Sequence, residues 1–122
     1  MSIDAIDHIQ FAMPAGEEEA ARKFYSGLLG VPEVPKPSEL ARRDGVWFKN
    51  GRVKIHLGVE AEFRPARKAH AGFVVRGLEA MVHTLRDAGI EVVEVEPRPE
   101  ARHVYLNDPF GNRIELIEPA EP

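Results

Sequence analysis

Apolar and polar positions repeat in the same order in the two halves of this chain. A helical spacing of apolar residues covers residues 17–29 and again 78–88, and each run stops at a glycine, Gly30 or Gly89. One strand-like run precedes each predicted helix and three short ones follow it. These runs cover residues 3–13, 31–34, 46–49 and 53–59 in the first half and residues 70–76, 90–95, 103–106 and 113–118 in the second. Each half is therefore predicted to fold as strand–helix–strand–strand–strand.

The offset between the halves predicts an internal repeat of about sixty residues. Gly30 and Gly89 lie 59 positions apart, and the turn glycines Gly51 and Gly111 lie 60 apart. The alternative is a single α+β sandwich in which these matches are coincidental. A half of this size buries too little surface to be stable alone, so the halves should pack together or with those of another chain. We predict an α+β domain over residues 1–122, with module 1 at about 1–60 and module 2 at about 68–120.

Composition narrows the class of protein. The chain has 122 residues, of which 43% are hydrophobic and 30% charged, as in ordinary globular proteins. It has no cysteine, which excludes disulfides, iron–sulfur clusters and cysteine nucleophiles. A net charge of −4 argues against nucleic acid as a partner. The sequence shows neither a long apolar run nor the pattern of a secretory signal, so we expect a cytoplasmic protein that does not contact a membrane.

Four residues that can bind a metal fall on the strand faces opposite the apolar ones. They are His8, His56, His70 and Glu115, and the repeat relates His8 to His70 and His56 to Glu115. Each taken alone is typical of a partly exposed strand residue. Their equivalent positions in two halves instead favour one shared site for a divalent cation, namely zinc, nickel, manganese, cobalt or iron.

Other residues of the same types are interpreted differently. His83 lies inside the second helix and off its apolar stripe, and His103 lies on a strand without a repeat partner, so both are interpreted as non-ligands. Trp47, Phe48 and Tyr105 occupy related places in the two halves, where they either line a cavity or pack in the core.

Several motifs of the chain together resemble the vicinal oxygen chelate superfamily. The motifs are Ile6-Asp7-His8-Ile9, the helix and stop at residues 20–30, Val53-Lys54-Ile55-His56-Leu57, Lys68-Ala69-His70 and the turn Asp108-Pro109-Phe110-Gly111-Asn112 leading to Glu115. This superfamily includes glyoxalase I, extradiol dioxygenases, methylmalonyl-CoA epimerase, and fosfomycin- and bleomycin-resistance proteins. The resemblance implies two tandem βαβββ modules whose curled mixed sheet encloses a cavity, with helices outside. It also implies metal ligands at His8, His56, His70 and Glu115, and a homodimer.

The same resemblance implies a metal-dependent lyase or isomerase of the glyoxalase type, acting on a small substrate with vicinal oxygens. Glu115 would then be both a metal ligand and the catalytic base. One position departs from the family, because glyoxalase I-like members commonly carry a carboxylate, and epimerases a glutamine, where this chain has His56. Two alternatives stay open: an Fe(II) extradiol-type dioxygenase, which needs two imidazoles and one carboxylate, and a metal-free small-molecule binding or resistance protein.

Overall fold

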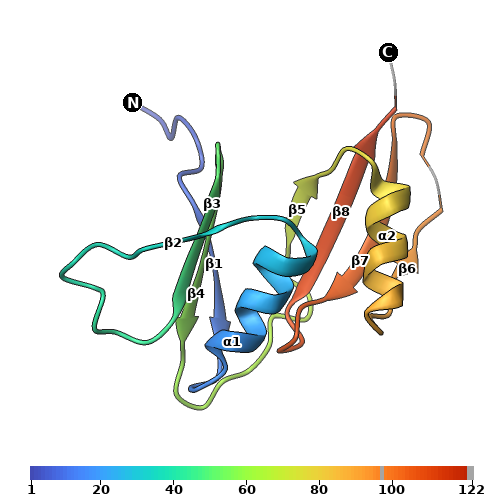
Figure 1. Cartoon of the computed structure of the whole chain (residues 1–122). Helices are drawn as coiled ribbons and strands as arrows, with labels where there is room; N and C mark the ends of the chain where they lie inside the picture. The colour runs from blue at the N-terminus through green and yellow to red at the C-terminus, as the bar shows by residue number, and fades with distance from the viewer. Residues whose placement is uncertain (97, 121–122) are drawn as a thin grey trace. The chain divides into compact units, whose positions relative to one another are not determined.

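The computed structural model describes residues 1–96 and 98–120, and the chain divides into two compact units (Figure 1). Unit 1 is Met1–Arg64 and unit 2 is Pro65–Pro122. Each unit has one strand, then a helical segment, then three strands. The predicted α+β class and the two tandem βαβββ modules are thereby confirmed. The single domain over residues 1–122 stays a prediction, and its last two residues lie outside the described part.

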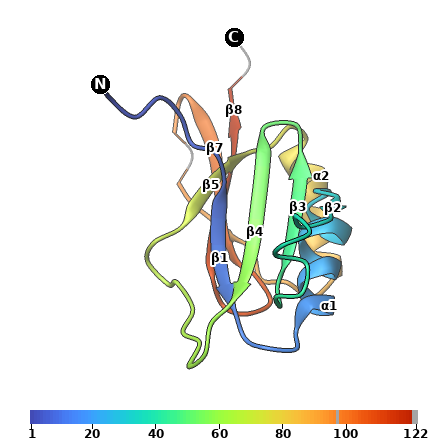
Figure 2. The same ribbon diagram turned by 90° about the vertical axis from the view of Figure 1, so that its left-hand side faces the viewer.

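Unit 1 contains a four-stranded mixed sheet with the strand order β1–β4–β3–β2, and Figure 2 shows β1, β4 and β3 side by side. Its elements are β1 (Ile9–Met13), α1 (Glu18–Ala21), the π-helical segment η1 (Arg22–Leu28), β2 (Glu33–Val34), β3 (Val46–Asn50) and β4 (Val53–Val59). Strand β1 runs parallel to β4, and the other pairs are antiparallel. Tyr25 of η1 is fully buried, with its ring centroid 5.9 Å from Phe11 and 5.5 Å from Phe48. The apolar stripe of the helical segment therefore covers one face of this sheet.

Unit 2 repeats this arrangement, with the strand order β5–β8–β7–β6. Its elements are β5 (Ala71–Val74), α2 (Leu78–Asp87), β6 (Val93–Glu94), β7 (Ala101–Asn107) and β8 (Arg113–Pro119). Helix α2 packs against β8. Leu78, Val82 and Leu85 are buried on the helix at the spacing that the sequence predicts, and Ile114 and Leu116 are buried on the strand.

Strand register shows that the repeat is structural as well as sequential. Gln10, two positions after His8, lies opposite His56 in the pairing of β1 with β4. Gly72, two positions after His70, lies opposite Glu115 in the pairing of β5 with β8. Because side chains alternate along a strand, both pairs occupy the same relative place in their own sheet. The predicted equivalence of His8 with His70, and of His56 with Glu115, is therefore present in the pairing.

The first helix differs from the single regular helix predicted over residues 17–29. Its second half, η1, is π-helical, and the N–H of Leu29 donates to the carbonyl of Phe24, five residues earlier, at 2.9 Å. Phe24 and Tyr25 are adjacent and both buried, with their rings edge to face at 4.9 Å. The wider turn thus accompanies the burial of two neighbouring aromatic residues.

Several strands are shorter than predicted. Strand β1 begins at Ile9 instead of residue 3, and the side chains of Ile3 and Ile6 are exposed. Strands β2 and β6 have two residues each, because the chain after each helix is first tied back to that helix. The N–H of Val31 donates to Tyr25 at 3.0 Å, and the N–H of Ile90 donates to Leu85 at 3.0 Å. These bonds delay the start of the following strand.

The turn before β8 is held by buried side chains. Asp108 Oδ1 accepts hydrogen bonds from the N–H groups of Phe110 and Asn112, both at 2.9 Å. Asn112 donates its side-chain amide to Asp108 Oδ2 and accepts the N–H of Ala66, again at 2.9 Å. Asp108 and Asn112 are both buried, so the turn motif of the sequence fixes the entry to the strand that carries Glu115.

In the part of the chain that the structure describes, no helix has both the length and the apolar run needed to cross a bilayer.

Candidate functional site

The two predicted ligands of unit 1 stack on one another. The ring centroids of His8 and His56 lie 4.2 Å apart, with 20° between the ring planes. His56 also stacks on Trp47 at 3.7 Å and 2°, so its ring lies between the other two. Trp47 is the β3 residue opposite His56 in register. The strand pairing therefore builds a short column of three flat rings on the face of the sheet away from Tyr25.

A carboxylate orients the outer imidazole of this column. His8 Nδ1 lies 2.9 Å from Asp7 Oδ2, and Asp7 Oδ1 accepts a hydrogen bond from Lys54 Nζ at 3.3 Å. Because a carboxylate only accepts, His8 Nδ1 carries the hydrogen in this contact. In the neutral ring this leaves the lone pair of Nε2 free, which is how a carboxylate commonly prepares a histidine for a metal.

The inner imidazole is held in its neutral form. Burial lowers the pKa of His56, and the neighbouring His8 lowers it further. Neutral imidazole is the form that binds metals, so at neutral pH His56 is ready to act as a ligand.

The two predicted ligands of unit 2 are in direct contact. His70 Nε2 lies 3.1 Å from Glu115 Oε1, and His70 Nδ1 lies 2.9 Å from the carbonyl oxygen of Lys68. A carbonyl only accepts, so Nδ1 carries the hydrogen and Nε2 of the neutral ring presents a lone pair to the carboxylate. Two acceptors face each other in that form. Either a second proton on His70 or a cation between the two groups relieves the repulsion.

This spacing suits a metal ion. Zinc binds histidine nitrogen and carboxylate oxygen at about 2.0–2.2 Å in tetrahedral geometry, so two of its ligands lie roughly 3.4 Å apart. The 3.1 Å between His70 Nε2 and Glu115 Oε1 lies close to that separation, and it is also the length of an ordinary hydrogen bond. The donor types and their spacing in unit 2 therefore fit a divalent cation.

His103 is a site residue that the sequence analysis missed. Its Nδ1 lies 2.5 Å from Glu115 Oε2, and both residues are buried. Its Nε2 has no hydrogen-bond partner among the residues that the structure describes. Alternation along β7 could have indicated the contact, because His103 shares a face with Tyr105, which lies opposite Glu115 in register. The sequence analysis interpreted His103 as a non-ligand because no histidine occupies the corresponding place in the first half. His83, in contrast, is exposed on α2 and pairs with Asp87 at 3.2 Å.

The two imidazoles keep the Glu115 carboxyl ionised. Burial alone would raise its pKa, but hydrogen bonds from His103 and then His70 outweigh this, and the pKa of Glu115 lies below its usual value. At neutral pH the group is therefore a carboxylate, which can bind a cation or accept a proton.

The structure brings the four predicted ligands together as two pairs. His8 lies against His56 in unit 1, and His70 lies against Glu115 in unit 2. Across residues 1–96 and 98–120, no three or more His, Cys, Asp or Glu side chains are gathered as a metal site. That all four bind one cation stays a prediction.

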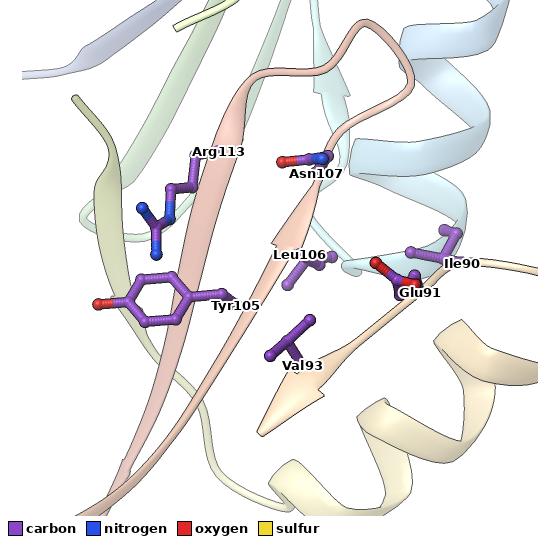
Figure 3. A pocket seen from close by; sticks show the side chains of 7 residues that line it. All are labelled: Ile90, Glu91, Val93, Tyr105, Leu106, Asn107 and Arg113. Atoms are coloured by element: carbon purple, nitrogen blue, oxygen red, sulfur yellow. The ribbon is translucent and has the colours of Figure 1, made fainter. Parts of the chain in front are cut away.

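Each unit has a cavity, and only that of unit 1 is lined by the predicted ligands of its own unit among the described residues. In unit 1 a cavity of about 700 Å³ is lined by His8, His56 and Trp47 among others. In unit 2 a cavity of about 430 Å³ is lined in part by Tyr105 and Arg113 (Figure 3).

The aromatic residues at related places have different roles. The guanidinium of Arg113 lies 4.0 Å from the ring centroid of Tyr105, and the ring of His70 meets Tyr105 edge-on at 5.4 Å. Trp47 and Tyr105 each line the cavity of their own unit, and Phe48, which borders the unit 1 cavity, is fully buried against Tyr25.

Comparison with known proteins extends this description. Residues 10–117 match the family model described as "Glyoxalase-like domain". No curated protein matches the chain in sequence. Among solved structures, the chain is similar to a protein from Bacillus anthracis assigned to the glyoxalase family, with 47% identity, a TM-score of 0.92 and 98% of each chain covered.

Two more distant structures share the fold. The antibiotic binding protein TnmS3 from Streptomyces sp. CB03234 has 22% identity and a TM-score of 0.73, over 98% of this chain and 99% of that one. The fosfomycin resistance protein FosX from Listeria monocytogenes has 16% identity and a TM-score of 0.73, over 99% of this chain and 95% of that one. At these identities the likeness is one of fold alone.

Proposed function

We propose that this chain, which belongs to the glyoxalase-like domain family of the vicinal oxygen chelate superfamily, is a metal-dependent lyase or isomerase of the glyoxalase type. Its substrate would be a small molecule with two neighbouring oxygens. The observation that carries the proposal is the contact of His70 Nε2 with Glu115 Oε1, two groups that can bind a divalent cation and that lie close to the spacing of neighbouring metal ligands. The stacked pair of His8 and His56 supplies two further donors of the type that divalent cations accept.

Four residues would hold the cation, namely His8, His56, His70 and Glu115. When bound, a divalent cation would supply Lewis-acid polarisation of the substrate oxygens. Asp7 and the carbonyl of Lys68 orient two of the imidazoles by accepting their Nδ1 hydrogens.

Glu115 is proposed as the catalytic base. Its lowered pKa keeps it ionised at neutral pH, so it can accept a proton from a substrate carbon and return it to the neighbouring one. His103 donates to Oε2, which leaves Oε1 as the oxygen that faces His70. Burial of the carboxylate keeps bulk water from competing for the same proton.

Metal analysis of protein purified without chelator tests the proposal. The parent protein should retain a divalent cation, whereas His70→Ala and Glu115→Ala should lose it. His83→Ala is the matched control, because that exposed imidazole lies on α2 and contacts Asp87. Unchanged metal content in the first two variants would refute the site. Exchange of a substrate proton with solvent deuterium should require both the metal and Glu115.

A second candidate is a metal-free protein that binds or sequesters a small molecule. The column of Trp47, His56 and His8 favours it, because flat rings beside a cavity of about 700 Å³ can pack against a planar ligand. Thermal unfolding separates the two functions. Divalent cations should raise the melting temperature of a metalloprotein and leave that of a sequestering protein unchanged.

A further inference from the structure

The cavity of unit 1 holds an excess of positive charge. Three lysines, Lys36, Lys49 and Lys54, line it together with the imidazoles of His8 and His56. Asp7 is the one carboxylate among the described residues of its lining. Apart from the imidazoles, the side chains of this lining carry three positive charges and one negative charge.

Two of the lysines face each other directly. Lys49 of β3 and Lys54 of β4 are register partners, and the next pair on the same face is Trp47 with His56. Like charges directly opposite on neighbouring strands destabilise a sheet. The pair thus has a cost in the protein alone, which a bound anion would offset.

The existing contacts do not remove this charge. Asp7 is shared between His8 and Lys54, at 2.9 Å and 3.3 Å. Lys36 donates two hydrogen bonds to the backbone carbonyls of residues 43 and 44, and these neutral acceptors leave its charge in place. Lys49 forms no ion pair within the part of the chain that the structure describes.

We propose that this lysine cavity binds the anionic group of a small molecule, a phosphate or a carboxylate. Lys49 and Lys54 hold the anion, and the indole of Trp47 forms an apolar wall beside it. The imidazoles of His8 and His56 line the same cavity. A substrate of the proposed metal site would then carry this anionic group, and that part of the inference rests on the proposed function. Anion binding by Lys49 and Lys54 itself needs no metal.

Titration of chelator-treated protein at low ionic strength tests the inference separately from the metal. Inorganic phosphate and acetate are the probes, and amide chemical shifts report on each. Lys49→Gln and Lys54→Gln should each weaken binding at least fivefold. Lys23→Gln removes the same charge from an exposed position on η1 outside the cavity, and should bind like the parent protein. Saturation by one probe alone identifies the anion as phosphate or carboxylate.

Stability gives a second readout. In low salt, Lys49→Gln should melt at a higher temperature than the parent, because one of two facing charges is gone. Phosphate should then stabilise the parent and Lys23→Gln more than Lys49→Gln. The inference is overturned if neither probe saturates, or if Lys49→Gln binds as tightly as Lys23→Gln. Such a result does not contradict the proposed function if His70→Ala and Glu115→Ala still lose the bound metal.

Discussion

Each oxygen of the Glu115 carboxylate has its own imidazole partner. His103 takes Oε2 at 2.5 Å, and His70 faces Oε1 at 3.1 Å. A carboxylate fixed at one oxygen presents the other in a defined direction, which is what outer partners of metal ligands commonly do. We therefore regard His103 as a positioning residue that acts through Glu115.

Replacing His103 should change metal affinity in a graded way. His103→Leu removes the donor to Oε2 and should weaken binding of a divalent cation about tenfold or more. His103→Asn keeps an N–H donor near the place of Nδ1 and should restore most of the affinity. Competition with a coloured chelator measures the dissociation constants, and thermal unfolding of the metal-free proteins checks their folding. Equal affinity in all three proteins would assign His103 a purely structural role.

Glu18 provides a pH-dependent contribution to the stability of unit 1. The N–H of Gly45 donates to Glu18 Oε2 at 2.9 Å, and this bond lowers the pKa of the carboxyl below its ordinary 4.5. A group with a lowered folded pKa stabilises the protein above its unfolded pKa and loses that effect as pH falls through the folded value. Glu18→Gln should therefore be less stable than the parent at pH 7. The difference should shrink below pH 4.5 and vanish at still lower pH, as followed by urea unfolding.

At the scale of single elements, the loop that enters β3 depends on a glycine. Gly45 has φ +104°, and a Cβ built on it would lie 2.4 Å from the carbonyl oxygen of Leu57 on β4. That oxygen belongs to the backbone of a paired strand and cannot move aside easily. Both the backbone conformation and the space therefore require glycine at this position.

Gly45→Ala should destabilise the protein by about 3 kcal/mol, from backbone strain together with the clash. Gly16→Ala is the matched control, because Gly16 has φ +81° and its added Cβ meets nothing within 4 Å. It should cost only about 1 kcal/mol. Chemical denaturation measures both, and equal losses would show that strain alone acts at Gly45.

At the scale of the whole molecule, the proposed four-ligand site would need donors from both units. Zinc, nickel, manganese or cobalt added to chelator-treated protein should raise the melting temperature. His56→Ala in unit 1 and Glu115→Ala in unit 2 should each abolish this rise. If only the unit 2 variant does so, the cation is bound within unit 2 and the four-ligand site is wrong. Sedimentation of the same samples tests the predicted homodimer.

Sequence periodicity was sufficient for the two modules and for the repeat equivalence of His8 with His70 and of His56 with Glu115, whereas the contacts within each unit came from the structure. Both follow from alternation and a fixed repeat, which depend on local residue order. The His103 contact was not predicted, because it joins strands diagonally and has no counterpart in the repeat. The length of β1 was also overestimated, since alternation at residues 3–8 resembles a strand although no neighbouring strand pairs with it among the described residues.

The strand pairing also bears on how the two modules diverged. Trp47 lies opposite His56 on the last strand of its module, and Tyr105 lies opposite Glu115 on the last strand of the other. Two residues before each aromatic residue, the first module therefore has Gly45 and the second has His103. If both descend from one duplicated ancestor, this site has since become specialised. The later copy of the motif carries an imidazole where the earlier copy has no room even for a methyl group. A histidine at position 45 would therefore require the backbone at Leu57 to move as well.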